Sequence, residues 1–582
     1  MNSQPVTLRP HSAPSATSFA LDAWSLGVVG LGALAAAPVL VVLSLALLPS
    51  DDIWAHLMAT VLLRYLITTL LLALGVCVGV LGIGLGTAWL VARCEFPARR
   101  VLAWALLLPL AMPGYLAAYA YTDILEYSGP VQSVLRGTFG WHSRQDYWFP
   151  EVRSLGGAIL FLSLVLYPYV YLLARTAFSE QSGGVMEAGR SLGRGPWGCF
   201  FTLALPLARP AIVVGLTLAL METLNDFGTV DYFAVPTFTV GIYRVWLGMG
   251  STAGAAQLAA LLVGIVLLLT GLERLARRQQ RFHHTTQRTG APPRFTLRGM
   301  PALMAFLAGL LPVVLGFGVP AGLLIAYTLD TWRELGPPSV AAALGNSLLL
   351  AGLTAAATVI TGLFLAYGVR LRPWPLMRAA TRAASLGYAV PGLVLAVGVM
   401  IPAAALDNAL DAFLRARFGV SSGLLLSGTL AALVFACTVR FLPLALGAAE
   451  AGLARITPAM DHAARSLGVP PREVLRRVHV PLLKGSVMGA ALLVFVDTVK
   501  ELPMTLLLRP FNFNTLSTHV YEQAASEQFR QAAPAALAIV LAGLAPVLLL
   551  GLGRHRPQGQ PPIPSHAQTK FSPARSSGIG DA

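Results

Sequence analysis

The sequence predicts an all-α protein that crosses a lipid bilayer twelve times, as two parallel repeats of six helices. The chain has 582 residues, of which 56% are hydrophobic and 12% are charged, whereas soluble domains carry roughly 25% charged residues. Apolar stretches of about 20 residues, long enough to cross a hydrocarbon core of roughly 30 Å, recur along the whole chain. A polar segment also occurs twice, 275 residues apart, which indicates an internal repeat.

The expected spans divide into two sets of six on either side of an arginine-rich stretch. We expect a first repeat over 23–273, a linker over 274–299 and a second repeat over 300–553, with disordered cytoplasmic tails at 1–22 and 554–582. The spans of the first repeat are predicted at 24–49, 62–92, 101–123, 155–176, 208–228 and 254–273. Those of the second are predicted at 301–328, 344–369, 378–403, 422–447, 484–508 and 531–553.

Charge predicts the orientation of these spans. Alternate loops collect arginine, and the linker alone carries seven, while the loops between them hold most of the carboxylates. Because cytoplasmic loops are enriched in Lys and Arg, both termini are expected in the cytoplasm. The net charge of +15 follows from the same rule and does not indicate nucleic-acid binding. Since six spans is an even number, both repeats enter the membrane in the same direction.

The repeated polar segment reads EAGRSLGRGPWGCFFTLALP at Glu187–Pro206 and HAARSLGVPPREVLRRVHVP at His462–Pro481. Each copy predicts a short helix, a turn and a second helix that leads into a span. Gly193 and Gly468 can take the positive φ that ends a helix. Pro206 and Pro481 suit the first turn of the following span, where a missing N–H costs little. Small residues before the turn allow close backbone approach: Ala188, Gly189, Ala463 and Ala464.

These segments resemble the EAA signature of bacterial ABC importer permeases. The signature falls on Glu187, Ala188, Gly189, Gly193, Leu203, Leu205 and Pro206, and on His462, Ala463, Ala464, Gly468, Val478, Val480 and Pro481. His462 replaces the acidic residue in the second copy, which suggests unequal halves. The resemblance implies that each segment is a coupling helix docked on one subunit of a cytoplasmic ATPase dimer.

The resemblance covers essentially the whole chain and implies a multi-pass protein of the bacterial inner membrane that receives its substrate from a periplasmic binding protein. The chain contains no GxxxxGK[ST] loop, so ATP is expected on a separate polypeptide and no cofactor is expected here. An ion-driven secondary transporter is the rival class, but it has no ATPase for the paired segments to contact. An enzyme is not supported, since neither HExxH nor a serine nucleophile motif is present.

Two further stretches, Glu222–Gly250 and Lys500–Tyr521, resemble those of fused permeases that import iron(III). Thiamine and polyamine permeases are close relatives, so these cations remain alternative substrates.

The residues of these stretches give a physical reason for a cation. Glu222 and Asp226 are spaced i, i+4, as are Asp497 and Glu501, so each pair is expected on one face of a helix. Acids inside a span usually face a cavity or a partner, and carboxylates suit a hard cation that is passed on without tight binding. The alternative is that they pair with a cation of the protein, such as Lys500, Arg244 or Arg509.

Pro113-Gly114 and Pro391-Gly392 occupy equivalent positions within the third and ninth spans. Each pair is either a helix break that lines the path or a device for close helix packing.

Overall fold

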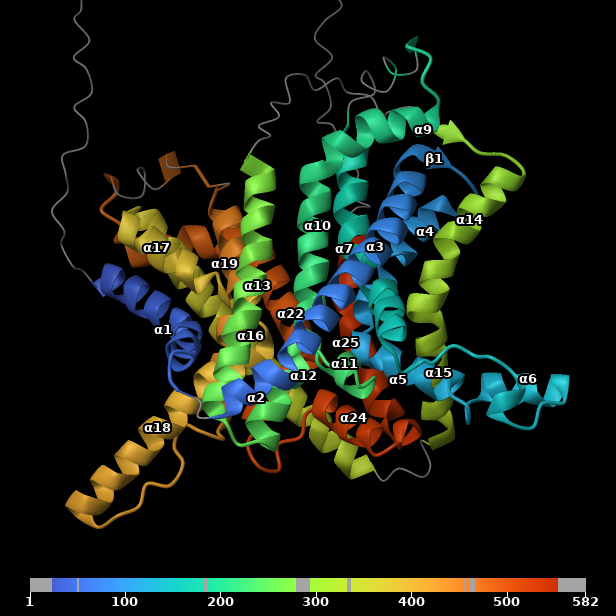
Figure 1. Ribbon diagram of the computed structural model, residues 1–582. Coiled ribbons are helices and arrows are strands. Elements are labelled where there is room, and N and C mark those ends of the chain that lie inside the picture. Colours follow the sequence, from blue (N-terminus) through green and yellow to red (C-terminus); the bar gives the residue numbers. More distant parts are fainter. Residues whose placement is uncertain are drawn as a thin grey trace, which may run out of the picture.

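The computed structural model describes residues 23–552, except 50–51, 182–186, 188, 190, 279–293, 332–336, 455, 458 and 461–465. Its described part contains eleven helices long and apolar enough to cross a membrane, or twelve if one bent pair counts as a span. The predicted all-α polytopic fold is therefore confirmed (Figure 1). The two predicted tails lie outside the described residues.

The first half places its long helices in the order that the apolar stretches predict. Its helices and strand are α1 (Ala23–Leu45), α2 (Asp52–Thr60), α3 (Leu62–Arg93), β1 (Cys94–Glu95), α4 (Arg99–Ala105), η1 (Leu108–Ala111), α5 (Gly114–Leu125), α6 (Pro130–Phe139), η2 (Arg144–Asp146), α7 (Leu155–Glu180), α9 (Pro196–Cys199), η3 (Phe200–Ala204), α10 (Leu205–Asn225), α11 (Gly228–Tyr232), α12 (Phe238–Tyr243), η4 (Arg244–Gly248) and α13 (Thr252–Arg278).

The second half repeats this order. Its elements are β2 (Phe295–Thr296), α14 (Met300–Val313), η5 (Val314–Gly318), α15 (Val319–Thr331), α16 (Pro337–Leu371), α17 (Pro375–Ala384), η6 (Gly387–Ala389), α18 (Gly392–Phe418), α19 (Leu430–Ala454), α21 (Pro471–Val474), η7 (Leu475–His479), α22 (Val480–Lys500), α23 (Pro503–Leu508), α24 (Leu516–Ala525) and α25 (Phe529–Leu552).

Equivalent helices of the two halves run in the same direction, so the repeats are parallel as predicted (Figure 1). The halves also exchange their first helices. Helix α1 packs against α17 and α18 of the second half, while α14 packs against α3 and α4, and α15 packs against α25 and α5. Sequence order alone gives no signal for this exchange, because the apolar faces of α1 and α14 fit either half.

The third and ninth spans are both interrupted at their Pro-Gly pairs. In the first half, the helical segments 99–111 and 114–139 are bent by 91° relative to each other. In the second half, Pro391 is the N-cap of α18 rather than an interior residue. The predicted span over 378–403 is therefore divided into α17, η6 and the start of α18, and the helix-break alternative holds at both pairs. Proline lacks the N–H that a helix interior needs and disfavours a helical residue before it, so the chain breaks there.

Wide π-helical turns precede the helices that carry Pro206 and Pro481. They are η3 and η7, and in each the following N–H bonds the carbonyl five residues earlier. Because each proline removes one i→i−4 bond, the helix widens next to it. Both prolines lie in the first turn of the next helix, as predicted.

Helix α13 continues to Arg278, into the predicted linker 274–299. The other end of the linker forms strand β2, which pairs in parallel with β1. Arg294 Nη1 lies 3.3 Å from Glu95 Oε2. The end of the linker is thus fixed to the first half, while residues 279–293 lie outside the described part.

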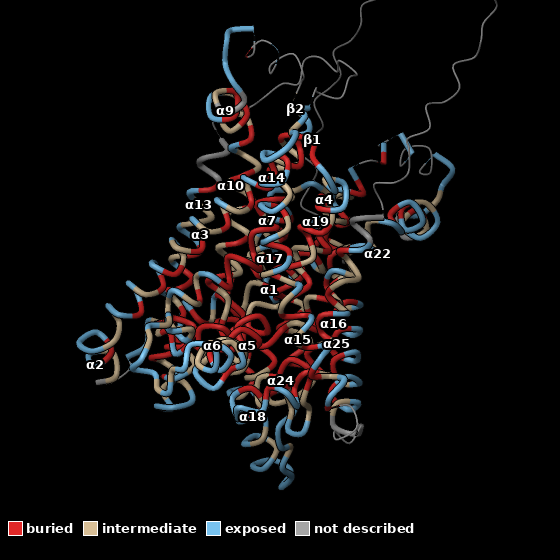
Figure 2. The backbone as a smooth tube through the Cα atoms, turned by 90° about the vertical axis from the view of Figure 1, so that its right-hand side faces the viewer, coloured by how far each residue is buried: buried red, intermediate tan, exposed pale blue. Residues whose placement is uncertain are grey.

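Buried residues fill the interior of the bundle, and exposed apolar residues cover much of its outside (Figure 2). Helix α3 is an example, with Leu63, Leu70, Leu74 and Val78 all exposed. Such apolar faces are stable only against lipid or another apolar surface, in agreement with a bilayer around these helices.

Candidate functional site

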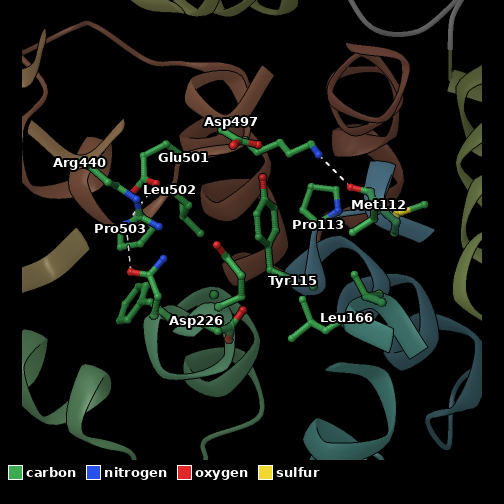
Figure 3. Close-up of a pocket in the computed structure, with 18 of the residues that line it drawn as sticks. Met112, Pro113, Tyr115, Leu166, Asp226, Arg440, Asp497, Glu501, Leu502 and Pro503 are labelled. Atoms are coloured by element: carbon green, nitrogen blue, oxygen red, sulfur yellow. Dashed lines mark hydrogen bonds and ion pairs between the residues drawn. The ribbon is translucent and has the colours of Figure 1, made fainter. Parts of the chain in front are cut away.

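A pocket of about 150 Å³ lies where the two halves meet (Figure 3). All four acids predicted for the substrate path line it: Glu222, Asp226, Asp497 and Glu501. The other polar side chains of its wall are Tyr115, Tyr169, Asn225, Tyr388, Arg440 and Lys500. The structure therefore brings the two sequence-predicted pairs together. Residues from both halves line the pocket.

The pairs do not share helix faces as the i, i+4 spacing predicts. Helices α10 and α22 end at Asn225 and Lys500, so Asp226 and Glu501 follow the last turn. Asp226 Oδ1 accepts hydrogen bonds from the N–H groups of Thr229 (3.1 Å) and Val230 (3.2 Å) at the start of α11. Acidic side chains that bond nearby backbone N–H groups compete with helix continuation, which explains the break.

Glu501 has the equivalent role in the second half. Its Oε1 accepts a hydrogen bond from the N–H of Met504 in the first turn of α23, at 3.1 Å. We name Asp226 and Glu501 the outer pair. Much of their acceptor capacity is used to hold the short helices α11 and α23 in place.

Glu222 and Asp497, which we name the inner pair, are differently placed. They lie within the last turn of α10 and α22, four residues before the outer pair. Glu222 Oε1 accepts a hydrogen bond of 3.1 Å from the Tyr388 hydroxyl. Asp497 has Lys500 as a cationic neighbour, and its carboxylate accepts no hydrogen bond within the described residues. The inner pair therefore keeps more acceptor capacity for a cation in the pocket.

Arg440 is the site residue that sequence reasoning missed. Its Nη1 lies 2.9 Å from Asn225 Oδ1 and 3.5 Å from Glu501 Oε2, and the Arg440 and Glu501 side chains are only 6% and 4% exposed. The alternative of an internal ion pair is thus confirmed for Glu501, but with a different partner from those predicted. The sequence does contain a signal for Arg440, because it is an arginine in the middle of the apolar stretch 430–454. Charged residues within a span usually have a partner or line a path.

Two of the three cations predicted as partners of the four acids, Lys500 and Arg509, also contact other groups. Lys500 Nζ donates to the Leu110 carbonyl at 2.9 Å, across the junction of the halves. Arg509 pairs with Glu522 at 2.5 Å. Within the described residues, no cluster of three or more His, Cys, Asp or Glu is arranged to hold a metal ion.

The two Pro-Gly breaks lie beside the residues of the pocket and contribute to it differently. Pro113 and Gly114 line it, and the missing side chains give room to the outer pair. A Cβ on Gly114 would lie 3.4 Å from Asp226 Oδ2, and one on Gly392 would lie 3.0 Å from Glu501 Oε1. The N–H of Gly392, freed by the break, donates to Asn225 Oδ1 of the other half at 2.7 Å.

The described parts of the two polar segments have the predicted turn. Gly193 and Gly468 have φ values of +77° and +74°. Glu187 is exposed, and Gly189 is buried where a Cβ would lie 2.6 Å from Leu203 Cδ1. Figure 1 shows α9 and the segment after α19 at the same end of the bundle. Ala188, His462, Ala463 and Ala464 lie outside the described residues.

An arginine binds the helix end before each polar segment. Arg93 is 1% exposed, and its Nη2 lies 3.4 Å from the Gln181 carbonyl after α7. In the second half, Arg370 Nη2 donates to the Ile456 carbonyl after α19 at 2.9 Å. Because the last carbonyls of a helix lack intrahelical partners, these arginines fix the point where each segment leaves the bundle.

The comparison with known families decides the identity. Residues 81–282 and 358–554 each match the family described as the binding-protein-dependent transport system inner membrane component. The chain belongs to this family. The two matches begin 277 residues apart, close to the offset of the polar segments, so this permease is a fusion of two family units.

Relatives of this permease carry several substrate names. The chain is 27% identical over 489 residues to a protein of Haemophilus influenzae named Fe(3+)-transport system permease protein FbpB 2, covering 83% of this chain and 88% of the relative. It is 29% identical over 191 residues to the molybdenum transport system permease protein ModB of Escherichia coli, covering 32% of this chain and 80% of that protein. A probable sulfate transport system permease protein of Nephroselmis olivacea is 29% identical over 147 residues, covering 25% of this chain and 49% of that protein.

Proposed function

We propose that this permease carries ferric iron across the bacterial inner membrane, from a periplasmic binding protein to the cytoplasm. The ion passes through the pocket between the halves, and a separate ATPase dimer drives the passage by moving the two polar segments. Both termini are cytoplasmic in this proposal, and the chain itself binds no cofactor.

The charge of the pocket is the observation that supports a cation. Four acidic side chains line the pocket with one guanidinium and one ammonium group, so the acids outnumber the cations by two. Both cations are already directed at protein oxygens, Arg440 at Asn225 and Glu501, and Lys500 at Leu110. A molybdate or sulfate ion would meet four acids whose negative charge repels it, whereas a hard cation meets oxygen ligands.

The size of the pocket favours an ion over an organic cation. Sites for organic ligands typically enclose roughly 300–1,000 Å³, and this pocket encloses about 150 Å³. Thiamine and polyamines are therefore less well accommodated. The iron-named relative also spans most of this chain, whereas the molybdenum- and sulfate-named relatives span 32% and 25% of it.

The two polar segments support an external motor. They lie at one end of the bundle. Each leads through a π-helical turn into the helix that carries one acid of the inner pair, and an arginine holds the helix end before each segment. A push on either segment would move α10 or α22 and thereby the pocket wall. A secondary transporter has no partner that would use such paired contacts.

The test is uptake into vesicles that contain the permease, its ATPase and its binding protein. We expect accumulation of ferric iron that requires ATP, with little accumulation of molybdate or thiamine under the same conditions. Accumulation of molybdate in place of iron would overturn the proposed substrate, and import of iron without nucleotide would overturn the proposed coupling.

A further inference from the structure

The Tyr115 hydroxyl is a buried polar group with no hydrogen-bond partner in the described part of the chain. The residue is 5% exposed and lines the central pocket. Leaving a buried donor unsatisfied costs about 1–3 kcal/mol, so a phenol at this position needs an explanation that phenylalanine would not. The ring projects into the pocket from the start of α5 (Figure 3).

Tyr115 is held in this position by the local fold. It directly follows the Pro113-Gly114 break, so its side chain leaves the chain where the span is interrupted. On the other side it packs closely against Gly228, where a Cβ would lie 2.7 Å from the Tyr115 Cβ. A larger residue at 228 would displace the ring from the pocket.

The charged neighbours of Tyr115 are the outer pair, Glu501 and Asp226. Neither accepts a hydrogen bond from its hydroxyl in the described part of the chain. Asp226 accepts three hydrogen bonds from Thr229 and Val230, and Glu501 accepts from Met504 and faces Arg440. The phenol oxygen therefore lies beside two carboxylates and is free to bind something that the pocket admits.

We propose that the Tyr115 oxygen is a ligand for a hard trivalent cation as it passes the outer pair. This inference rests on the proposed cation function and assigns it a residue. When the ion arrives, the O–H bond of Tyr115 breaks, its proton moves to a carboxylate of the outer pair, and an oxygen–metal bond forms. When the ion moves inward the proton returns, so no net proton or electron is consumed.

A phenol suits this task for two reasons. Anionic oxygen ligands match a hard, highly charged ion, and tyrosine oxygen is an established ligand of iron in proteins. A phenol also gives up its proton less readily than a carboxylic acid does, so a proton competes with the metal and keeps the binding transient. The inner pair and Tyr388 then offer the next set of oxygens, about one helical turn further along α10 and α22.

The chain offers a matched control for Tyr115. Tyr119 lies one turn later on α5, is completely buried and also has a hydroxyl without a described partner, but it does not line the pocket. Tyr119→Phe therefore removes the same group from a similarly dry environment. Any effect of losing a buried phenol on folding is expected in both variants.

The first measurement is uptake of radioactive ferric iron in the reconstituted system. Tyr115→Phe is expected to slow uptake roughly tenfold, because loss of a group at a metal site typically costs 10–100-fold in affinity or activity. Tyr119→Phe is expected to transport at the wild-type rate. Equal rates for the wild type and both variants would overturn the assignment of Tyr115 while leaving iron transport established.

The second measurement is visible absorption of the purified complex titrated with ferric nitrilotriacetate. A phenolate bound to ferric iron gives a charge-transfer band, which we expect in the wild type and in Tyr119→Phe but not in Tyr115→Phe. A band that survives Tyr115→Phe would overturn the assignment. If the wild type fails to transport ferric iron at all, the proposed function fails, and that result is separate from these comparisons.

Discussion

The two halves of this permease repeat their architecture but not their charges. Arg440 is 275 residues after Val165, and Lys500 is 275 residues after Asn225, so both cations of the pocket belong to the second half. The acids, in contrast, are present in both. We infer that the shared carboxylates provide the path and that the unshared cations hold the halves together.

The hydrogen bonds between the halves support this division. Arg440 reaches Asn225 of the first half at 2.9 Å, and Lys500 reaches the Leu110 carbonyl at 2.9 Å. Further along the same junction, the Tyr521 hydroxyl donates to Asp231 Oδ2 at 2.8 Å. The second half therefore supplies these donors and the first half supplies the acceptors. Substitutions of the carboxylates and substitutions of the cations should therefore have different effects on uptake and stability.

The largest effect is expected from Arg440→Leu. It leaves Glu501 buried without its cation, and breaking a buried pair in this way costs about 3–5 kcal/mol. Thermal unfolding in detergent should show a large loss of stability, together with loss of uptake. Adding Glu501→Gln should restore much of the stability, whereas Val165→Leu at the equivalent position should change little. A single Arg440→Leu variant as stable as the wild type would contradict the role of this pair.

Loss of coupling is expected from Gly193→Pro and from Gly468→Pro. Proline requires φ near −65°, which is incompatible with the positive φ of both turns. Uptake should fall more than about tenfold while ATP hydrolysis by the associated ATPase continues, because a 1 Å displacement can cost 10²-fold in a reaction.

Gly195→Ala is the control for these variants. A Cβ added to Gly195 would have no other atom within 4 Å, and this residue does not have a positive φ. Its coupling ratio should equal that of the wild type. Normal uptake in both proline variants would show that the turns do not transmit movement.

A smaller effect is expected from neutralising the inner pair with Glu222→Gln and Asp497→Asn. These acids carry few structural hydrogen bonds, so uptake of the cation should fall roughly tenfold, the effect of about 1.4 kcal/mol of lost attraction, with little change in thermal stability. The matched variant Asp226→Asn with Glu501→Gln removes the outer pair and should lower stability more. Equal loss of stability in the two double variants would sink the distinction between the pairs.

The smallest expected difference lies between the two Pro-Gly breaks. A Cβ on Gly392 would lie 2.5 Å from Arg440 Nη1, whereas on Gly114 its nearest atom is 2.9 Å away, at the end of the Leu162 side chain. Leucine can rotate away, but Arg440 is held by Asn225 and Glu501. Gly392→Ala should therefore reduce uptake several-fold more than Gly114→Ala, and equal or reversed effects would contradict this difference between the halves.

The parts of this molecule that follow local rules could be predicted from the sequence. Apolar length gave the spans, and the positive φ of Gly193 and Gly468 followed from their position between two short helices. The acids were predicted to line one path because charge within an apolar stretch is costly. Where local chemistry competes, the prediction failed: Asp226 and Glu501 end their helices by bonding the next backbone N–H groups.

Other features depend on contacts between distant segments. Nothing in the sequence near Arg440 specifies Asn225 or Glu501 as its partners, and the free hydroxyl of Tyr115 follows only from what surrounds it. The exchange of α1 and α14 between the halves has the same origin, because an apolar helix face fits more than one apolar surface. The assignment of the four acids to substrate passage stays a prediction.

The central claim is that the cargo occupies the pocket between the halves during transport, and a thiol placed in its wall tests this directly. Val165 lines the pocket and is not one of the proposed ligand residues. Val165→Cys can therefore report on the pocket in a variant whose four native cysteines are alanine. With the ATPase and binding protein present, gallium(III), a redox-inert ion of the same charge, should slow modification of this thiol by a small methanethiosulfonate reagent. A thiol at the exposed position 247 should react at an unchanged rate. Transport of the ion with no protection of the thiol at position 165 would contradict the account.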